Sequence, residues 1–242
     1  MDTDVIVVIV VLLFSVGFHE AAHAWSADKL GDPGPRAAGR VTLNPLKHLD
    51  PFLSVILPGL LLWFGLPLFG GGKPVAVNVG ALRSPRRDFM LVALAGPGSN
   101  LLLALLCAVG WASLVWTGVL ESWSEVNPIN GRLMVEPPTF LQSPKGVADM
   151  ALRTGATLNT LLAAFNLIPI PPLDGSRVIG WLLPSRLAMF WYRFDKVGIL
   201  LVLIFFFGMT STSQPILREV LTTLYEPIAD VADGLAALGT DA

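Results

Sequence analysis

The sequence predicts an α-helical integral membrane protein with about four transmembrane helices, a re-entrant apolar segment and short membrane-associated β-strands. Apolar residues make up 53% of the 242 residues and charged residues only 14%, whereas soluble domains carry about 25% charged residues. Several apolar runs approach the roughly 20 residues that a helix needs to cross a bilayer. Proline and glycine interrupt one such run, and broken backbone at membrane depth needs protein or water around it.

Four segments have the apolar character of membrane-spanning helices. The small residues Gly17, Ala21, Ala22 and Ala24 in the first of them would let neighbouring helices approach closely. The cluster Ala95-Gly96-Pro97-Gly98-Ser99-Asn100 in the second would permit close packing in the same way. The four predicted spans cover residues 5–28, 89–116, 147–167 and 197–209.

Residues 52–69 are apolar as well, but prolines and glycines divide them. We predict a re-entrant segment here, with a full crossing as the alternative. Residues 39–43 and residues 70–79 resemble strands. In residues 70–79 polar and apolar residues alternate, as they do in a strand. The second could pair with an extended peptide, or it could be an ordinary interfacial loop. From residue 215 the chain looks amphipathic, so we expect a membrane core of residues 1–214 and a tail of residues 215–242.

The distribution of basic residues favours re-entry. If residues 52–69 do not cross, residues 27–88 lie on one side together with the segment after the third helix. That side then carries twelve of the sixteen Lys and Arg residues, and cytoplasmic segments are the ones enriched in such residues. Both termini would lie on the opposite side. The twelve are Lys29, Arg36, Arg40, Lys47, Lys73, Arg83, Arg86, Arg87, Arg177, Arg186, Arg193 and Lys196.

The motif H-E-x-x-H, formed by His19, Glu20 and His23, lies near the end of the first apolar run. On a helix, positions four apart lie above one another, so both histidines would point the same way. Two imidazoles at this spacing supply half of a tetrahedral zinc site, and Glu20 is placed to take a proton from a water on the zinc. Because ionisable groups at membrane depth are costly and usually functional, we favour zinc over a chance pair of histidines.

A catalytic zinc ion commonly has three protein ligands, and Asp174 is the best third candidate. Three prolines between residues 169 and 172 stop the third helix, which leaves Asp174 on irregular backbone beside a span. In the topology above, this point and the end of the first helix both approach the cytoplasmic side. The prediction is therefore one zinc ion held by His19, His23 and Asp174, with Glu20 as the general base.

Three further polar residues are weaker candidates. Asn166 could donate to a developing oxyanion, or it could make a hydrogen bond at the helix end. His48 could be another polar group of the site, but we favour a hydrogen bond within its own turn. Asn100 is retained as a possible secondary site residue.

These motifs occur in the order seen in site-2 proteases, which are intramembrane zinc metalloproteases. The resemblance covers the chain from the first helix to about Leu183. It implies zinc ligation by His19, His23 and Asp174, a base role for Glu20 and a substrate or oxyanion role for Asn166. It also implies that β-structure in residues 36–43 and 70–79 presents the substrate as a strand. The motifs are His19-Glu20-Ala21-Ala22-His23, Asn44-Pro45 with His48 and Asp50-Pro51, Ala95-Gly96-Pro97 with Asn100, and Asn166 with Pro169 and Pro172-Leu173-Asp174-Gly175.

The resemblance implies hydrolysis of peptide bonds in or near transmembrane segments of other membrane proteins. We expect a multi-pass protein of the bacterial plasma membrane, whose partners are the bilayer and a membrane-protein substrate. A net charge of −2 argues against a nucleic-acid partner, and the oligomeric state is not indicated. Many relatives carry a PDZ domain or a CBS pair, and the sequence is expected to be a minimal form without either. The alternatives are a membrane zincin of the CAAX-processing type, which generally uses glutamate as its third ligand, and an inactive pseudoprotease.

Overall fold

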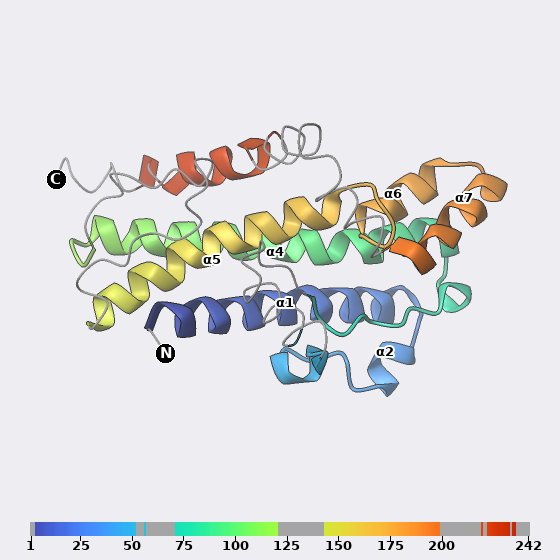
Figure 1. The fold of residues 1–242 in the computed structure, drawn as a ribbon, viewed down its shortest axis with the longest axis horizontal. Coiled ribbons are helices and arrows are strands. Elements are labelled where there is room, and N and C mark those ends of the chain that lie inside the picture. Colours follow the sequence, from blue (N-terminus) through green and yellow to red (C-terminus); the bar gives the residue numbers. More distant parts are fainter. Residues whose placement is uncertain are drawn as a thin grey trace. The chain divides into compact units, whose positions relative to one another are not determined.

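The computed structural model describes residues 3–51, 56, 71–120, 143–198, 219, 222–232 and 234–235. These residues are mainly helical (Figure 1). The predicted re-entrant segment and the fourth predicted span lie almost wholly outside the described residues. The elements are α1 (Thr3–Leu30), α2 (Gly34–Ala37), α4 (Pro85–Trp116), α5 (Pro144–Leu167), α6 (Gly175–Leu182) and α7 (Ser185–Trp191), with the short 3₁₀ helices η1 (Pro45–His48), η3 (Val79–Ala81) and η5 (Tyr192–Val197).

Two of these helices are long and apolar enough to cross a membrane. They are residues Val5–Leu30 of α1 and the whole of α4, Pro85–Trp116. The first two predicted spans are thus confirmed as long helices, and the third is confirmed as the helix α5. The count of four spans stays a prediction.

Local sequence explains where α4 and α5 begin and end. Pro85 occupies the first turn of α4, where its missing N–H costs nothing. The carboxylate of Asp88 accepts a hydrogen bond from the backbone N–H of Ser84 at 2.7 Å and so caps this end of the helix. The helix therefore begins at Pro85, four residues before the predicted start at residue 89. At the other end, α5 stops at Leu167 because Pro169 follows within two residues.

Contacts between residues divide the chain into two compact units. The first comprises residues 1–12, 100–165 and 203–242, and the second comprises residues 13–99 and 166–202. In the first unit, Trp111 Nε1 of α4 and Arg153 Nε of α5 each donate to Asp149 Oδ1 at 2.9 Å. These bonds give the buried carboxylate the partners that a buried charge needs. The apolar core around them comprises Ala108, Trp111, Ala112, Val115, Leu120, Ala156 and Ala232.

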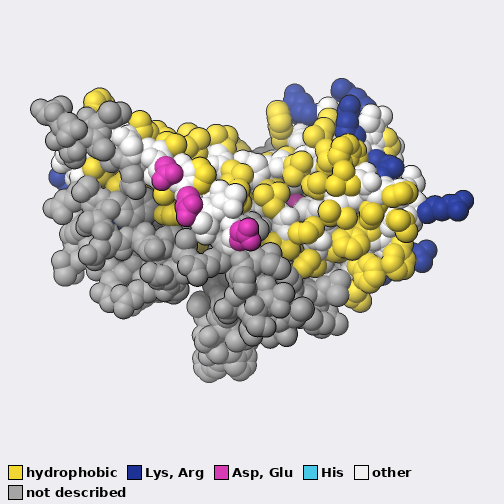
Figure 2. Space-filling view, turned by 90° about the horizontal axis from the view of Figure 1, so that it is seen from above, with side chains coloured by type: hydrophobic (Ala, Val, Ile, Leu, Met, Phe, Trp, Pro, Cys, Tyr) yellow, Lys and Arg dark blue, Asp and Glu magenta, His cyan; other side chains and the backbone are white. Residues whose placement is uncertain are grey.

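The second unit contains α2, α6, α7 and parts of α1 and α4. The sequence reasoning did not predict α6 or α7; α6 packs against α7, and α7 against η5 (Figure 1). Figure 2 shows Lys and Arg side chains projecting around the right-hand end of the view, the end at which Figure 1 labels α6 and α7. All twelve basic residues that the sequence assigned to one side of the membrane belong to this unit.

The predicted strands at residues 36–43 and 70–79 are wrong for the residues that the structure describes. Residues 36–37 complete α2, residues 38–39 form a turn, residues 41–42 form a bend, and residues 71–78 form no regular element. Side chains take the backbone hydrogen bonds that a strand ladder would need. Asp32 Oδ2 accepts the N–H of Asn78 at 2.7 Å, and Arg40 donates to the carbonyl of Lys73. Because Pro74 also lacks an N–H, residues 73, 74 and 78 cannot take part in a regular ladder.

Candidate metal centre

The imidazoles of His19 and His23 meet on one side of α1, as the i, i+4 spacing predicts. Their Nε2 atoms lie 3.0 Å apart, and their ring planes are almost perpendicular with centroids 4.6 Å apart. Both residues are buried, with 8% of their surface exposed. The helix period thus brings two nitrogen atoms that can bind a metal ion close together within the second unit.

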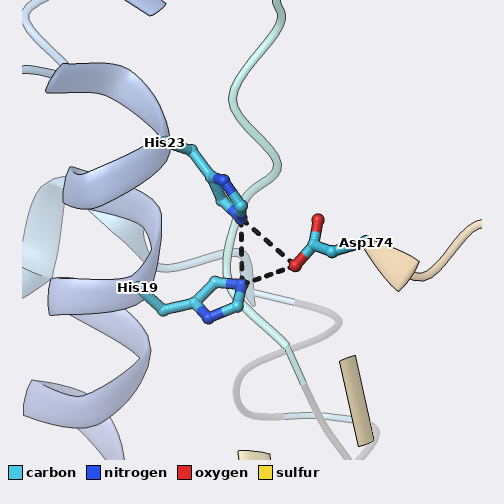
Figure 3. Close-up of side chains that lie close together, drawn as sticks. All are labelled: His19, His23 and Asp174. Carbon is cyan, nitrogen blue, oxygen red and sulfur yellow. Dashed lines mark hydrogen bonds and ion pairs between the residues drawn. The ribbon is translucent and has the colours of Figure 1, made fainter. Parts of the chain in front are cut away.

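Asp174 completes a group of three ligand atoms (Figure 3). Its Oδ2 atom lies 3.2 Å from His19 Nε2 and 3.4 Å from His23 Nε2. Tetrahedral zinc with bonds of about 2.0–2.1 Å separates its ligand atoms by about 3.3 Å. The three separations observed, 3.0, 3.2 and 3.4 Å, therefore fit three of the four corners of a zinc site.

The hydrogen bonding of these atoms also fits a cation. His23 Nδ1 lies 2.7 Å from the carbonyl oxygen of Val92, which can only accept, so Nδ1 carries a hydrogen, and Nε2 of the neutral imidazole carries the lone pair that a metal ion would bind. Asp174 Oδ2 is buried and makes no hydrogen bond to any described residue. A carboxylate lone pair and an imidazole lone pair that converge in a buried place are unfavourable unless a positive charge lies between them.

Asp174 reaches the histidines because the chain turns sharply between α5 and α6. A methyl group at Gly175 would lie 2.1 Å from the carbonyl oxygen of Leu167, so only glycine allows this close return to the end of α5. Asp174 stands at the start of α6, but its side chain caps no helix N–H and points to His19 and His23 instead.

Helix α4 forms the wall behind the two imidazoles. A methyl group at Gly96 would lie 2.4 Å from His23 Nε2 and 2.6 Å from His19 Cε1. The carbonyl of Val92, one turn earlier on α4, fixes the ring of His23 as described above. The small-residue cluster that the sequence marked for close packing therefore packs against the metal ligands themselves.

Glu20 lies beside the three ligands but is not one of them. It is buried, with 8% of its surface exposed, and its Oε2 atom has no hydrogen-bond partner among the described residues. A methyl group at Gly72 would lie 2.8 Å from Glu20 Cγ, so Gly72 packs directly against this side chain. Its free oxygen is available to a water or to a substrate group.

The weaker candidates occupy other positions. His48 is fully buried, and its Nε2 donates to the carbonyl of Thr42 at 2.8 Å, which is the local hydrogen bond that the sequence favoured. Asn100 belongs to the first unit, where its amide donates to Asn159 Oδ1 at 2.8 Å. Asn166 lies half-buried in the last turn of α5, and its role stays a prediction.

Three residues shape the site without binding a metal ion, and this role was not predicted from the sequence. They are Gly72, Val92 and Gly96, none of which carries a reactive group. The signal for the two glycines was present in the runs Gly70-Gly71-Gly72 and Ala95-Gly96-Pro97. The contact of Val92 has no sequence signal, because a backbone carbonyl is the same in every residue.

Comparison with known proteins shows which family the chain resembles. The sequence profile of peptidase family M50 matches residues 66–209, a range that includes Gly96 and Asp174. "Putative zinc metalloprotease YwhC" of Bacillus subtilis strain 168 is 31% identical over 229 residues, which cover 91% of this chain and 93% of that protein. No solved structure gives a significant match.

Two mycobacterial proteins match a shorter part of the chain. "Putative zinc metalloprotease Rip2" of Mycolicibacterium smegmatis is 38% identical over 170 residues, and its namesake in Mycobacterium tuberculosis H37Rv is 33% identical over 173 residues. In both cases the match covers 70% of this chain but only 54% of the relative, so the chain spans about half the length of these proteins. On the profile match and the similarity to YwhC, the chain belongs to peptidase family M50, the site-2 protease family that its motifs resemble.

Proposed function

We propose that this protein is an intramembrane zinc metalloprotease that hydrolyses peptide bonds in or near transmembrane segments of other membrane proteins. The observation that carries the proposal is the convergence of His19, His23 and Asp174 to within 3.4 Å, with the buried carboxylate of Glu20 beside them. Family membership and the names of the relatives support zinc and proteolysis.

The site residues have two kinds of role, metal binding and proton transfer. His19, His23 and Asp174 would hold one zinc ion, which supplies a Lewis acid for the peptide carbonyl and lowers the pKa of water. Glu20 takes a proton from the attacking water and returns it to the leaving amine. Asn166 is proposed to donate its amide N–H to the developing oxyanion.

The substrate is proposed to bind in an extended form along residues 75–77. Val75 and Val77 are half-buried while Ala76 is exposed, which is the alternation of an extended segment. No hydrogen bond joins the backbone of these three residues to another described residue. An extended peptide could therefore pair with them, and a transmembrane helix would have to unwind first.

The proposed topology has four spans and a re-entrant segment, with the active site towards the cytoplasm of a bacterial cell. Support comes from the basic residues, because twelve of sixteen belong to the unit that holds the candidate metal centre. Single cysteines at positions 71–88, in a Cys107→Ala background, are expected to be protected from a membrane-impermeant reagent added outside. Labelling as strong as that of a periplasmic control would show that residues 52–69 cross instead.

Removal and return of the metal tests the proposed function. We expect purified protein in liposomes to cleave a tagged single-span substrate, to lose this activity when a chelator removes zinc, and to regain it with added zinc. Asp174→Ala should lose both zinc and cleavage and should not recover, because two imidazoles alone bind the ion weakly. Cleavage that persists in the fully metal-free protein would refute the proposal.

A further inference from the structure

The guanidinium of Arg40 joins two segments that are distant in the sequence. Its Nη1 donates to the carbonyl of Lys47 at 2.5 Å, and its Nη2 donates to the carbonyl of Lys73, 33 residues further along the chain. The backbone N–H of Lys73 in turn donates to the carbonyl of His48 at 2.7 Å. We call this arrangement of Arg40, Lys47, His48 and Lys73 the Arg40 clamp.

The clamp is held against α1 at the level of Glu20. Gly72, which immediately precedes Lys73, is buried, and a methyl group there would lie 2.8 Å from Glu20 Cγ and 2.9 Å from Val16 Cγ1. At the other end of the clamp, a methyl group at Gly17 would lie 3.0 Å from Cα of Pro45. Both clamped segments therefore rest directly on the turns of α1 that carry Glu20.

Hydrogen bonds to described residues do not fix the Oε2 atom of Glu20. Its Oε2 atom makes no hydrogen bond to a described residue, and the side chain is buried. Packing against Gly72 is therefore one contact that limits where the carboxylate can point. A shift of about 1 Å at a catalytic group can cost about 100-fold in rate.

The metal ligands have different supports. His23 is held by the carbonyl of Val92, both imidazoles pack on Gly96, and Asp174 is positioned by the close return of Gly175 to the end of α5. None of these contacts involves the clamp. Loss of the clamp should therefore disturb Glu20 while the three ligands stay in place.

We infer that Arg40 is a positioning residue for the general base, which acts by holding Gly72 against Glu20. This inference rests on the proposed function, because it assigns Glu20 the role of base. Arginine suits the task, since its planar guanidinium can donate to two separate carbonyls at once. Lysine carries the same charge but offers a single point donor, so it cannot hold both segments in the same way.

The test compares zinc content and the single-turnover rate of cleavage of a single-span substrate in liposomes. Arg40→Gln should keep about one zinc per chain and lose about 100-fold in rate, and Arg40→Lys should recover little of it. Arg36→Gln is the control, because Arg36 is an exposed arginine that pairs with Asp28 at 2.6 Å outside the clamp. It should cleave at the wild-type rate.

A pair of glycine substitutions tests the same contact without touching Arg40. Gly72→Ala should keep zinc and lose rate like Arg40→Gln, because its methyl group would displace Glu20. Gly71→Ala is the matched control, since a methyl group there would meet no atom within 4 Å. This pair decides the question even if Arg40→Gln does not fold.

Three results would overturn the inference while leaving the proposed function intact. Loss of zinc together with rate in Arg40→Gln would mean a general structural role. A full rate in Arg40→Lys would mean that positive charge alone is required, and a full rate in Gly72→Ala would mean that the contact with Glu20 is unimportant. A wild-type protein that does not cleave would instead refute the proposed function itself.

Discussion

Glu20→Gln is expected to abolish cleavage while leaving the zinc content unchanged. Glutamine has the shape of glutamate but cannot accept the proton of the attacking water, and general-base catalysis contributes about 100- to 10,000-fold in rate. The zinc content should stay at the wild-type value because Glu20 is not among the three converging ligand atoms. The measurement is cleavage of a single-span substrate in liposomes together with metal analysis of the same preparation.

The outcome of this substitution separates two accounts of Glu20. A rate within a factor of about three of the wild type would show that Glu20 is not the base, since this lies far below the contribution of general-base catalysis. Loss of zinc along with activity would show that Glu20 helps to bind the metal. Neither result is compatible with the roles proposed above.

Gly96→Ala is expected to remove both zinc and cleavage. Its methyl group would lie 2.4 Å from His23 Nε2, the atom that would bind the metal, and 2.5 Å from the neighbouring Cε1. The imidazoles and α4 cannot both keep their places, so the ligand geometry should be lost. In a helix, alanine is more stable than glycine by about 0.5–1 kcal/mol. A loss of zinc and cleavage in Gly96→Ala would therefore not come from helix propensity.

Gly98→Ala provides the matched control for this effect. It lies two residues further along the same helix, and a methyl group there would meet no atom within 4 Å. It should bind zinc and cleave as the wild type does. Normal zinc content in Gly96→Ala would show that α4 does not form the wall of the site as described.

The parts of the site that depend on local sequence were predictable. The spacing of His19 and His23 follows from the helix period, and the prolines before Asp174 explain why that carboxylate leaves the helix. The meeting of these two elements, more than 150 residues apart, was inferred from topology, and the distances of 3.2 and 3.4 Å between them agree. The wall formed by Val92 and Gly96 depends on how two helices pack, which a single sequence does not reveal.

The strands that were wrongly predicted show what else cannot be predicted from the sequence. Alternation in residues 70–79 is a real feature, since Val75 and Val77 are half-buried between exposed neighbours. However, Arg40 and Asp32 take hydrogen bonds that a ladder would need. Long-range bonds from side chains to the backbone leave no periodic trace in the sequence. The helices α6 and α7 were missed because they are only 8 and 7 residues long, too short for a clear helical period.

X-ray absorption at the zinc edge of the purified protein is the most direct test of the proposed zinc site. We expect about one zinc per chain, with nitrogen and oxygen neighbours at about 2.0–2.1 Å, among them the imidazoles of His19 and His23. Sulfur at about 2.3 Å would implicate Cys107 instead of the three residues. That result, or a spectrum unchanged in the Asp174→Ala protein, would contradict a zinc site built by His19, His23 and Asp174.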